Sequence, residues 1–358
     1  MGRGVISIRL ADETRPSRLH QPERATTRFD LSLSENPFPP LPSVLAAVNG
    51  VLAQANRYPE FLPRRLPKLI AAHLGLHPDQ VVVGSGATGV AMQIIQTLTT
   101  PGAGIVYGAP TFDGYPIMAE MAGLDIVPVP LDAGGNQDLP AIARAVDQRT
   151  GLVVVCRPHN PTGTVVPVGL LEAFLYAVPR RVPVILDEAY VEFLGAADRI
   201  DTSALLHRHP NLLVLRTFSK AYGLAGLRIG YVIGNGELIN RVRRLQLPFG
   251  VSSAAVAAVA ASYAAEPELA ARIVRITAER EALRNALCHR GIPVPRSHAN
   301  FLYLPGPGAA TTLRRAGISA KAYLDGSARI TVGDHEADNA VLHAFSPRGD
   351  FAPIPEAS

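Results

Sequence analysis

The chain has 358 residues and a formal net charge of +4, with 34 lysines and arginines against 30 aspartates and glutamates. Its 47% hydrophobic and 18% charged residues are typical of a folded protein and exclude a disordered chain. The basic residues are scattered, without the stripe or tail typical of nucleic-acid-binding proteins, so we expect no nucleic-acid partner. Only three of them are lysines, Lys68, Lys220 and Lys321, so chemistry that needs an amine side chain has three candidates.

Two further absences narrow the class of protein. No stretch approaches the ~18 apolar residues of a membrane helix, and the apolar part of the N-terminus is too short for a signal peptide. Cys156 and Cys288 stand at unrelated positions, which indicates free thiols in a reducing compartment and no metal motif. We therefore expect a soluble cytoplasmic protein without a membrane partner or a bound metal.

The first two thirds of the chain alternate between β-branched apolar runs and segments with helical spacing. This alternation predicts an α/β fold with a mostly parallel sheet that helices cover on both faces. The predicted strands are residues 81–83, 105–106, 126–129, 152–155, 182–186, 212–215 and 229–233.

Strands become sparse after about residue 235. Apolar spacing predicts one long helix over 266–290, ended by Gly291, and short strands follow at 301–304 and 329–332. These elements indicate a smaller α+β domain at the C-terminus. We expect an N-terminal arm at 1–36, a large domain at 37–245, a small domain at 246–346 and a tail at 347–358.

A glycine loop at 84–89 follows a predicted strand and precedes a helix, so its backbone amides suit an anion. Its Gly-x-Gly-x-x-Gly pattern is the fingerprint of dinucleotide-binding proteins, but the acidic residue expected about 20 positions later is missing. The loop alone is compatible with three interpretations: a nicotinamide or flavin site, a purely structural turn, or a site for another phosphate.

Three segments that each follow a predicted strand carry the chemistry: 157–163, 186–190 and 217–231. They contain a lysine amine that could form a Schiff base, and a carboxylate that could hold a pyridine nitrogen in its protonated form. Ser219 and Arg228 could bind a phosphate. These are the groups that a pyridine-based electron sink requires.

With these segments, the chain resembles the histidinol-phosphate aminotransferase family, including its aromatic amino acid aminotransferase branch. The match runs from Leu33-Ser34-Glu35-Asn36-Pro37 to Arg329-Ile330-Thr331-Val332-Gly333, and the string from Ser219 to Tyr231 is its most specific part. The resemblance implies a fold type I transferase of class I/II that depends on pyridoxal 5′-phosphate (PLP).

The resemblance also implies the role of individual residues. Lys220 would form the Schiff base with the cofactor and carry the proton in catalysis. Asp187 would bind the ring nitrogen, Asn160 and Tyr190 would bind the phenolic oxygen, and Phe112 would stack on the ring. The phosphate would be held by Ala87, Thr88, Thr217, Ser219 and Arg228.

Tyr58 resembles a tyrosine that reaches the phosphate in the neighbouring subunit, which implies a homodimer with shared active sites. Arg329 resembles the arginine that binds the carboxylate or phosphate of the substrate, and Asn36 and Lys321 are expected to lie at the substrate as well.

Three departures from the family bear on the substrate. The N-terminal arm lacks the family's Pro-Tyr-x-Pro-Gly element, His159 replaces an asparagine, and Lys321 stands where relatives often have an arginine. Since a lysine lacks the guanidinium fork, these departures weaken histidinol phosphate as the donor. We expect amino transfer from phenylalanine, tyrosine or histidinol phosphate to 2-oxoglutarate. The alternatives are a PLP-dependent decarboxylase of the threonine-phosphate type, an NAD-linked oxidoreductase and a non-catalytic binding module.

Overall fold

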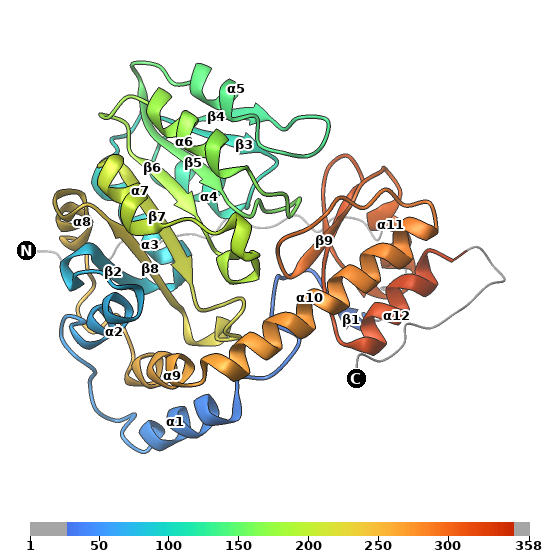
Figure 1. Cartoon of the computed structure of the whole chain (residues 1–358), viewed down its shortest axis with the longest axis horizontal. Helices are drawn as coiled ribbons and strands as arrows, with labels where there is room; N and C mark the ends of the chain where they lie inside the picture. Colours follow the sequence, from blue (N-terminus) through green and yellow to red (C-terminus); the bar gives the residue numbers. More distant parts are fainter. Residues whose placement is uncertain (1–26, 347–358) are drawn as a thin grey trace, which may run out of the picture.

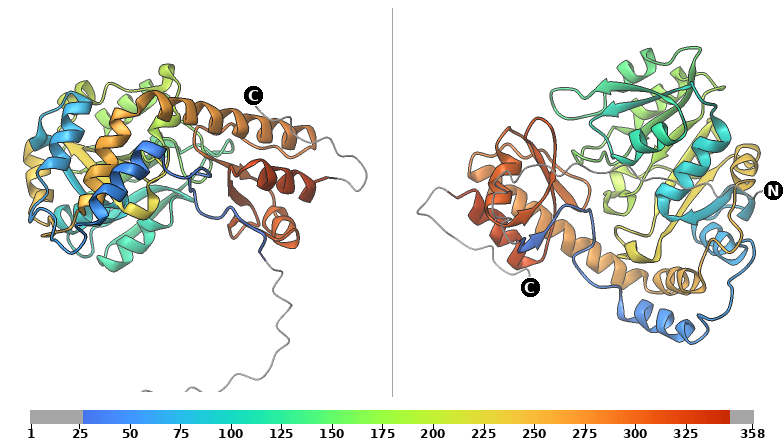
Figure 2. Two further views of the ribbon diagram at one scale, coloured as in Figure 1. Left: turned by 90° about the horizontal axis from the view of Figure 1, so that it is seen from below. Right: turned by 180° about the vertical axis from the view of Figure 1, so that it is seen from behind.

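The computed structural model describes residues 27–346. Most of the predicted arm (1–26) and the whole predicted tail (347–358) lie outside the described residues. The chain forms a larger body around a central sheet and a smaller body beside it, and helix α10 (Glu266–His289) runs from one to the other (Figures 1 and 2). This helix lies almost where the apolar spacing predicts it.

The central sheet has seven strands in the order β2-β8-β7-β6-β5-β3-β4. All of them are parallel except β8, which runs antiparallel to both of its neighbours. The seven predicted strands are all present, and the prediction of a mostly parallel sheet is confirmed. Their bounds are β2 (Val81–Ser85), β3 (Gly104–Ala109), β4 (Asp125–Pro130), β5 (Thr150–Cys156), β6 (Val184–Asp187), β7 (Leu212–Thr217) and β8 (Ile229–Gly234).

Both faces of this sheet are buried, because alternate residues along each strand point to opposite sides. In β5, Val153 and Val155 join one apolar cluster, and Leu152 and Val154 join the other. The first cluster is covered by α1 (Pro42–Leu52), α2 (Arg65–Leu74), α5 (Leu139–Arg144), α6 (Val168–Ala177), α7 (Thr202–Arg208) and α9 (Ser253–Ala264). The second is covered by α3 (Gly86–Leu98), α4 (Gly114–Met121) and α8 (Gly236–Arg243). The short helical turns are η1 (Pro78–Gln80), η2 (Val191–Phe193), η3 (Ala196–Asp198) and η4 (Ala225–Leu227).

The smaller body has an antiparallel sheet in the order β11-β12-β9 and a parallel pair, β1 with β10. Its strands are β1 (Phe29–Asp30), β9 (Phe301–Leu304), β10 (Ile318–Ser319), β11 (Lys321–Ala322) and β12 (Ala328–Thr331), and its helices are α11 (Ala309–Arg315) and α12 (His335–Ala344). The C-terminal half of α10 packs into the same apolar cluster through Leu283 and Leu287. Strand β1 therefore starts the described chain inside the smaller body, and the chain then crosses to α1 (Figure 2).

Helix α9 belongs by packing to the larger body, although it follows residue 245. Its Ala255, Ala258 and Val259 join the apolar cluster that also holds Val44 of α1 and Ile70 of α2. The predicted domain boundaries stay a prediction, and this packing favours a passage between the two bodies within α10.

Gly230 makes a closely packed contact between β8 and the start of α3. It lies opposite Gly84 in the β2–β8 pairing, and a Cβ added to it would lie 2.2 Å from the Ala87 nitrogen. Because these neighbours are backbone atoms, they can move aside only if the strand and the helix separate. We expect Gly230→Ala to lower the free energy of unfolding by roughly 3 kcal/mol in urea denaturation. Gly236→Ala is the matched control, because no atom lies within 4 Å of its added Cβ. Equal stability of the two variants would contradict this account.

Candidate active site

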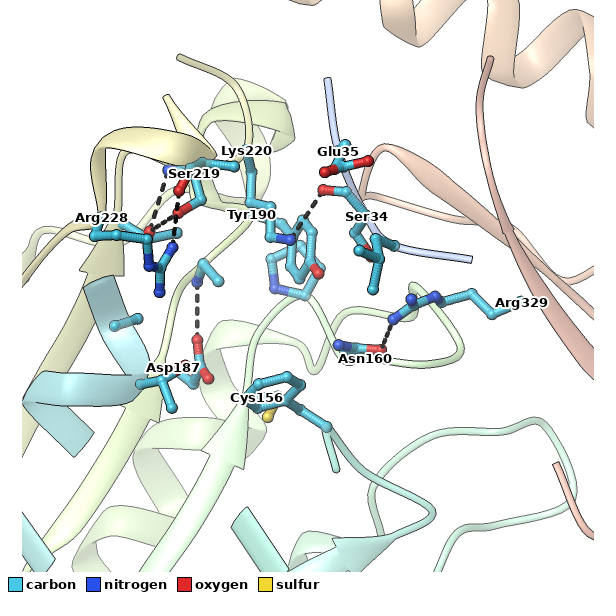
Figure 3. Close-up of a pocket in the computed structure, with 18 of the residues that line it drawn as sticks. Ser34, Glu35, Cys156, Asn160, Asp187, Tyr190, Ser219, Lys220, Arg228 and Arg329 are labelled. Atoms are coloured by element: carbon cyan, nitrogen blue, oxygen red, sulfur yellow. Dashed lines mark hydrogen bonds between the residues drawn. The ribbon is translucent and has the colours of Figure 1, made fainter. Parts of the chain in front are cut away.

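A cavity of about 470 Å³ lies where the carboxyl ends of β5, β6 and β7 meet the start of α3 (Figure 3). This is the edge at which parallel α/β sheets bind their ligands. The smaller body closes it with Arg329 and with the segment of residues 31–36, which we call the strap. The predicted site residues that line the cavity are Ala87, Thr88, Phe112, Asn160, Asp187, Tyr190, Thr217, Ser219, Lys220, Arg228 and Arg329.

Lys220 lies on the loop after β7, and its amine is buried inside the cavity. Its Nζ donates a hydrogen bond of 2.9 Å to the Ser34 carbonyl oxygen of the strap (Figure 3). Burial lowers the pKa of Lys220 to about 8, and the positive charge of Arg329 adds to this effect. An amine with such a pKa is partly neutral near neutral pH, so it can act as a nucleophile or a base.

Asp187 ends β6 at the floor of the cavity. Its Oδ2 accepts a 2.6 Å hydrogen bond from the Tyr115 hydroxyl, and its Oδ1 accepts one of 3.0 Å from the Ala189 amide. Burial raises the pKa of Asp187, and these two hydrogen bonds oppose the rise. Sequence reasoning missed Tyr115, the second residue of α4, because its partner Asp187 lies 72 residues further along the chain and no local pattern indicates such a contact.

Tyr190 is buried in the cavity wall beside Lys220. Its ring packs edge-on against Phe301 with 5.1 Å between ring centroids, and the Lys220 Nζ lies 5.7 Å from its centroid. Burial raises the pKa of Tyr190 to about 12, so its hydroxyl stays protonated and can donate a hydrogen bond.

Arg329 is held between the two bodies. Its Nη1 donates to the Asn160 Oδ1 at 2.8 Å, and its Nη2 donates to the Ser32 carbonyl at 2.7 Å. Its buried Nε has no hydrogen-bond partner within residues 27–346. The guanidinium is therefore fixed in place and retains hydrogen-bonding capacity for an anion.

An anion cup is built at the start of α3. Arg228 has a left-handed backbone (φ 53°) and lies so close to Gly86 that a Cβ there would be 2.3 Å from its Nη2. Thr217 and Ser219 add hydroxyl groups 2.9 Å apart, and the helix supplies free amides at Ala87 and Thr88. No carboxylate in the described part of the chain forms an ion pair with Arg228. This donor set suits a phosphate.

Three predicted site residues lie outside the cavity. Asn36 donates to the Lys220 and Ala221 carbonyls at 3.2 and 3.0 Å, so it fixes the strap to the lysine loop. Tyr58 is 83% exposed, and its ring lies 4.6 Å from that of Phe249. Lys321 forms an ion pair with Asp113. His159, which departs from the family pattern, is buried beside Thr162 and has its pKa lowered to about 3 by burial.

A buried ion pair supports the floor of the cavity. The Arg216 guanidinium contacts the Glu188 carboxylate at 2.7 Å and donates to the Thr202 hydroxyl at 2.8 Å. Glu188 directly follows Asp187, and Arg216 directly precedes Thr217. The pair thus fastens together the ends of β6 and β7, from which two site residues project. Sequence reasoning did not identify it.

The fold, with its lysine, carboxylate and anion cup, defines the class of protein: a fold type I transferase. The family model for aminotransferases of class I and II matches residues 26–345, and the chain belongs to this family. It is therefore an aminotransferase.

Named relatives agree with this assignment. The aromatic amino acid aminotransferase of Streptomyces coelicolor is 41% identical over 318 residues, covering 88% of this chain and 89% of that protein. The corresponding protein of Cutibacterium acnes is 42% identical, with 87% and 90% covered. The crystal structure of histidinol-phosphate aminotransferase from Sinorhizobium meliloti in complex with PLP superposes with a TM-score of 0.83, at 27% identity, covering 89% of this chain and 90% of that one.

Residues 27–346 contain neither a membrane-spanning helix nor a cluster of metal ligands. None of the helices there combines the length and apolar character needed to cross a membrane. No group of three or more His, Cys, Asp or Glu side chains in that range is arranged to hold a metal ion.

The buried amine predicts an unusual pH dependence of stability. Below about pH 8 the folded, cofactor-free protein keeps the Lys220 ammonium out of water, whereas the unfolded chain solvates it up to the ordinary pKa of 10.5. Lys220→Met should therefore raise the free energy of unfolding at pH 7 by up to about 3 kcal/mol. The gain should shrink as the pH rises from 8 to 10.5, because the wild-type amine then becomes neutral.

Urea unfolding at pH 7 and at pH 10 measures this difference. Lys68→Met is the control, because Lys68 is exposed on α2, and it should change stability little at either pH. A gain at Lys220 that does not vary with pH would show that packing, and not charge, is responsible.

Proposed function

We propose that the chain is a PLP-dependent aminotransferase whose amino donors are aromatic amino acids and whose acceptor is 2-oxoglutarate. The observation that carries the proposal is the buried Lys220 amine in one cavity with Asp187, between the anion cup at Arg228 and the guanidinium of Arg329 (Figure 3). Such a cavity offers one amine, one carboxylate and two separate anion sites. The two free cysteines agree with a cytoplasmic location, which is part of the same proposal.

The residues present fit PLP. The anion cup of Ala87, Thr88, Thr217, Ser219 and Arg228 would hold the phosphate. Asp187 would hold the ring nitrogen, Asn160 and Tyr190 the phenolic oxygen, Lys220 the aldehyde carbon, and Phe112 a face of the ring. When bound, PLP supplies an electron sink for the electrons released at the substrate α-carbon.

The side chains of the cavity would then have different roles in the reaction. Arg329 binds the substrate carboxylate and orients the α-carbon. Lys220 moves the proton, since an amine with a pKa of about 8 is partly neutral near neutral pH. The Tyr115 hydroxyl and the Ala189 amide hold Asp187 in position. The strap excludes water above the amine.

The choice of donor rests on the relatives and on the cavity wall. The curated relatives described above carry the name aromatic amino acid aminotransferase. The wall includes Leu33, Phe112 and Tyr190, which suit a planar ring. Histidinol phosphate is the second candidate donor, because the similar structure at 27% identity is that of a histidinol-phosphate aminotransferase. A panel of phenylalanine, tyrosine, histidine and histidinol phosphate, each assayed with 2-oxoglutarate, ranks the donors.

Replacement of Lys220 tests the cofactor and the reaction together. We expect borohydride reduction of the PLP-loaded enzyme to leave a pyridoxyl group on Lys220, located by peptide mapping. Lys220→Ala should lose that label, and transamination should fall at least about a thousand-fold. Lys68→Ala should keep both. Unchanged turnover in Lys220→Ala would refute the proposal, and carbon dioxide release without a 2-oxo acid would favour the decarboxylase alternative.

We also propose a homodimer in which Tyr58 reaches the partner's cavity. Tyr58, Phe61 and Leu247 are 83%, 61% and 65% exposed, and an apolar surface of this kind is typical of an interface. If sites are shared, mixing inactive Lys220→Ala with weakened Tyr58→Ala should restore part of the activity, because one hybrid site then contains both intact residues. Gel filtration checks the dimer. Absence of complementation in a proven mixed dimer would show that Tyr58 serves its own subunit.

A further inference from the structure

Two cations lie side by side on the face of the smaller body that meets the cavity. Lys321 of β11 and Arg329 of β12 are directly paired across the antiparallel ladder, which puts their side chains on the same face. Arg329 lines the cavity, as described above. Two like charges in this arrangement repel each other unless a counter-charge is near.

Asp113 supplies the counter-charge to Lys321 alone. It directly follows Phe112, which lines the cavity, and its ion pair with Lys321 joins the larger body to the smaller one. The Lys321 and Asp113 side chains are 35% and 51% exposed. The hydrogen bonds that Arg329 makes within residues 27–346 go to neutral acceptors. Lys321, Arg329 and Asp113 therefore carry a net charge of one positive unit together, whereas the two cations alone would carry two.

We propose that Asp113 is a specificity-determining residue. It sets the net charge of the pair Lys321 and Arg329, which we call the substrate clamp. By neutralising Lys321 it leaves Arg329 as the single cation, which matches the one negative charge of an amino acid carboxylate. A phosphate monoester carries nearly two negative charges and would need both cations. The inference rests on the proposed function and deepens it, because it selects carboxylate donors over phosphorylated ones.

Two ligands that differ only in the anion test the clamp without turnover. Calorimetry on the PLP-loaded enzyme compares 3-phenylpropionate, a carboxylate, with 2-phenylethylphosphonate. The wild-type enzyme should bind the carboxylate more tightly. Asp113→Asn frees Lys321 and should improve binding of the phosphonate relative to the carboxylate roughly ten-fold.

Two further variants separate charge from closure. Lys321→Met breaks the same contact between the two bodies but frees no cation, so it should not improve phosphonate binding. Glu120→Gln removes an exposed negative charge at the other end of α4 and should leave the ratio unchanged. A wild-type preference for the phosphonate, or equal shifts in Asp113→Asn and Lys321→Met, would overturn the inference.

The same variants assayed as enzymes separate this inference from the proposed function. Asp113→Asn should raise kcat/KM for histidinol phosphate relative to phenylalanine, mainly through KM. If the analogues bind as expected and no donor is turned over, the proposed function fails and the clamp stands. If phenylalanine is transaminated and the ratio in Asp113→Asn equals that of wild type, the clamp fails and the function stands.

Discussion

The burial of the Lys220 amine is the constraint on which the site depends. An ammonium removed from water is costly unless it is paired, and the partner here is the Ser34 carbonyl of the strap. The strap is fixed to the smaller body by the Thr331 amide on the Leu31 carbonyl at 2.9 Å, and by the Asn300 side chain on the Glu35 carbonyl at 2.9 Å. The lysine thus projects from one body into an enclosure that the other body completes, and its lowered pKa is a consequence of that closure.

The order of the strands explains how distant residues reach this amine. Strands β5, β6 and β7 are neighbours and parallel, so Asn160, Asp187 and Thr217 meet at one edge of the sheet. Strand β8 then runs back antiparallel between β7 and β2. Because it begins at this same edge, it brings Arg228 against the start of α3, and the closely packed Gly230 is what allows that approach. One reversal of strand direction therefore builds the anion cup.

The sequence predicted the parts of the site that depend on side-chain identity near strand ends. Apolar runs located all seven strands of the central sheet, and the motifs around Asp187 and Lys220 located the cavity. The sequence could not predict the contact between Lys220 and the strap, because the acceptor at Ser34 is a backbone carbonyl, which every residue has. The Lys321–Asp113 pair spans 208 residues, and no local pattern indicates such a partner. Helix α9 is rich in alanine and has no distinct apolar face, so its sequence does not indicate which of the two bodies it packs against.

The charges of the cavity offer two separate places for an anion, which the proposed function assigns to the cofactor phosphate and the substrate carboxylate. Arg228 and Arg329 both line it and have no carboxylate partner in an ion pair within the described chain. Lys220 and Asp187 lie between them (Figure 3). Arg228 adds to the helix amides at α3, where a dianionic phosphate is favoured. Arg329 lies across the cavity and its hydrogen bonds go to neutral acceptors, so it offers one positive charge, which would match a single carboxylate (Figure 3). Under the proposed function each anion would be better matched at its own end, and the cavity would fix the direction in which cofactor and substrate meet at the Lys220 amine.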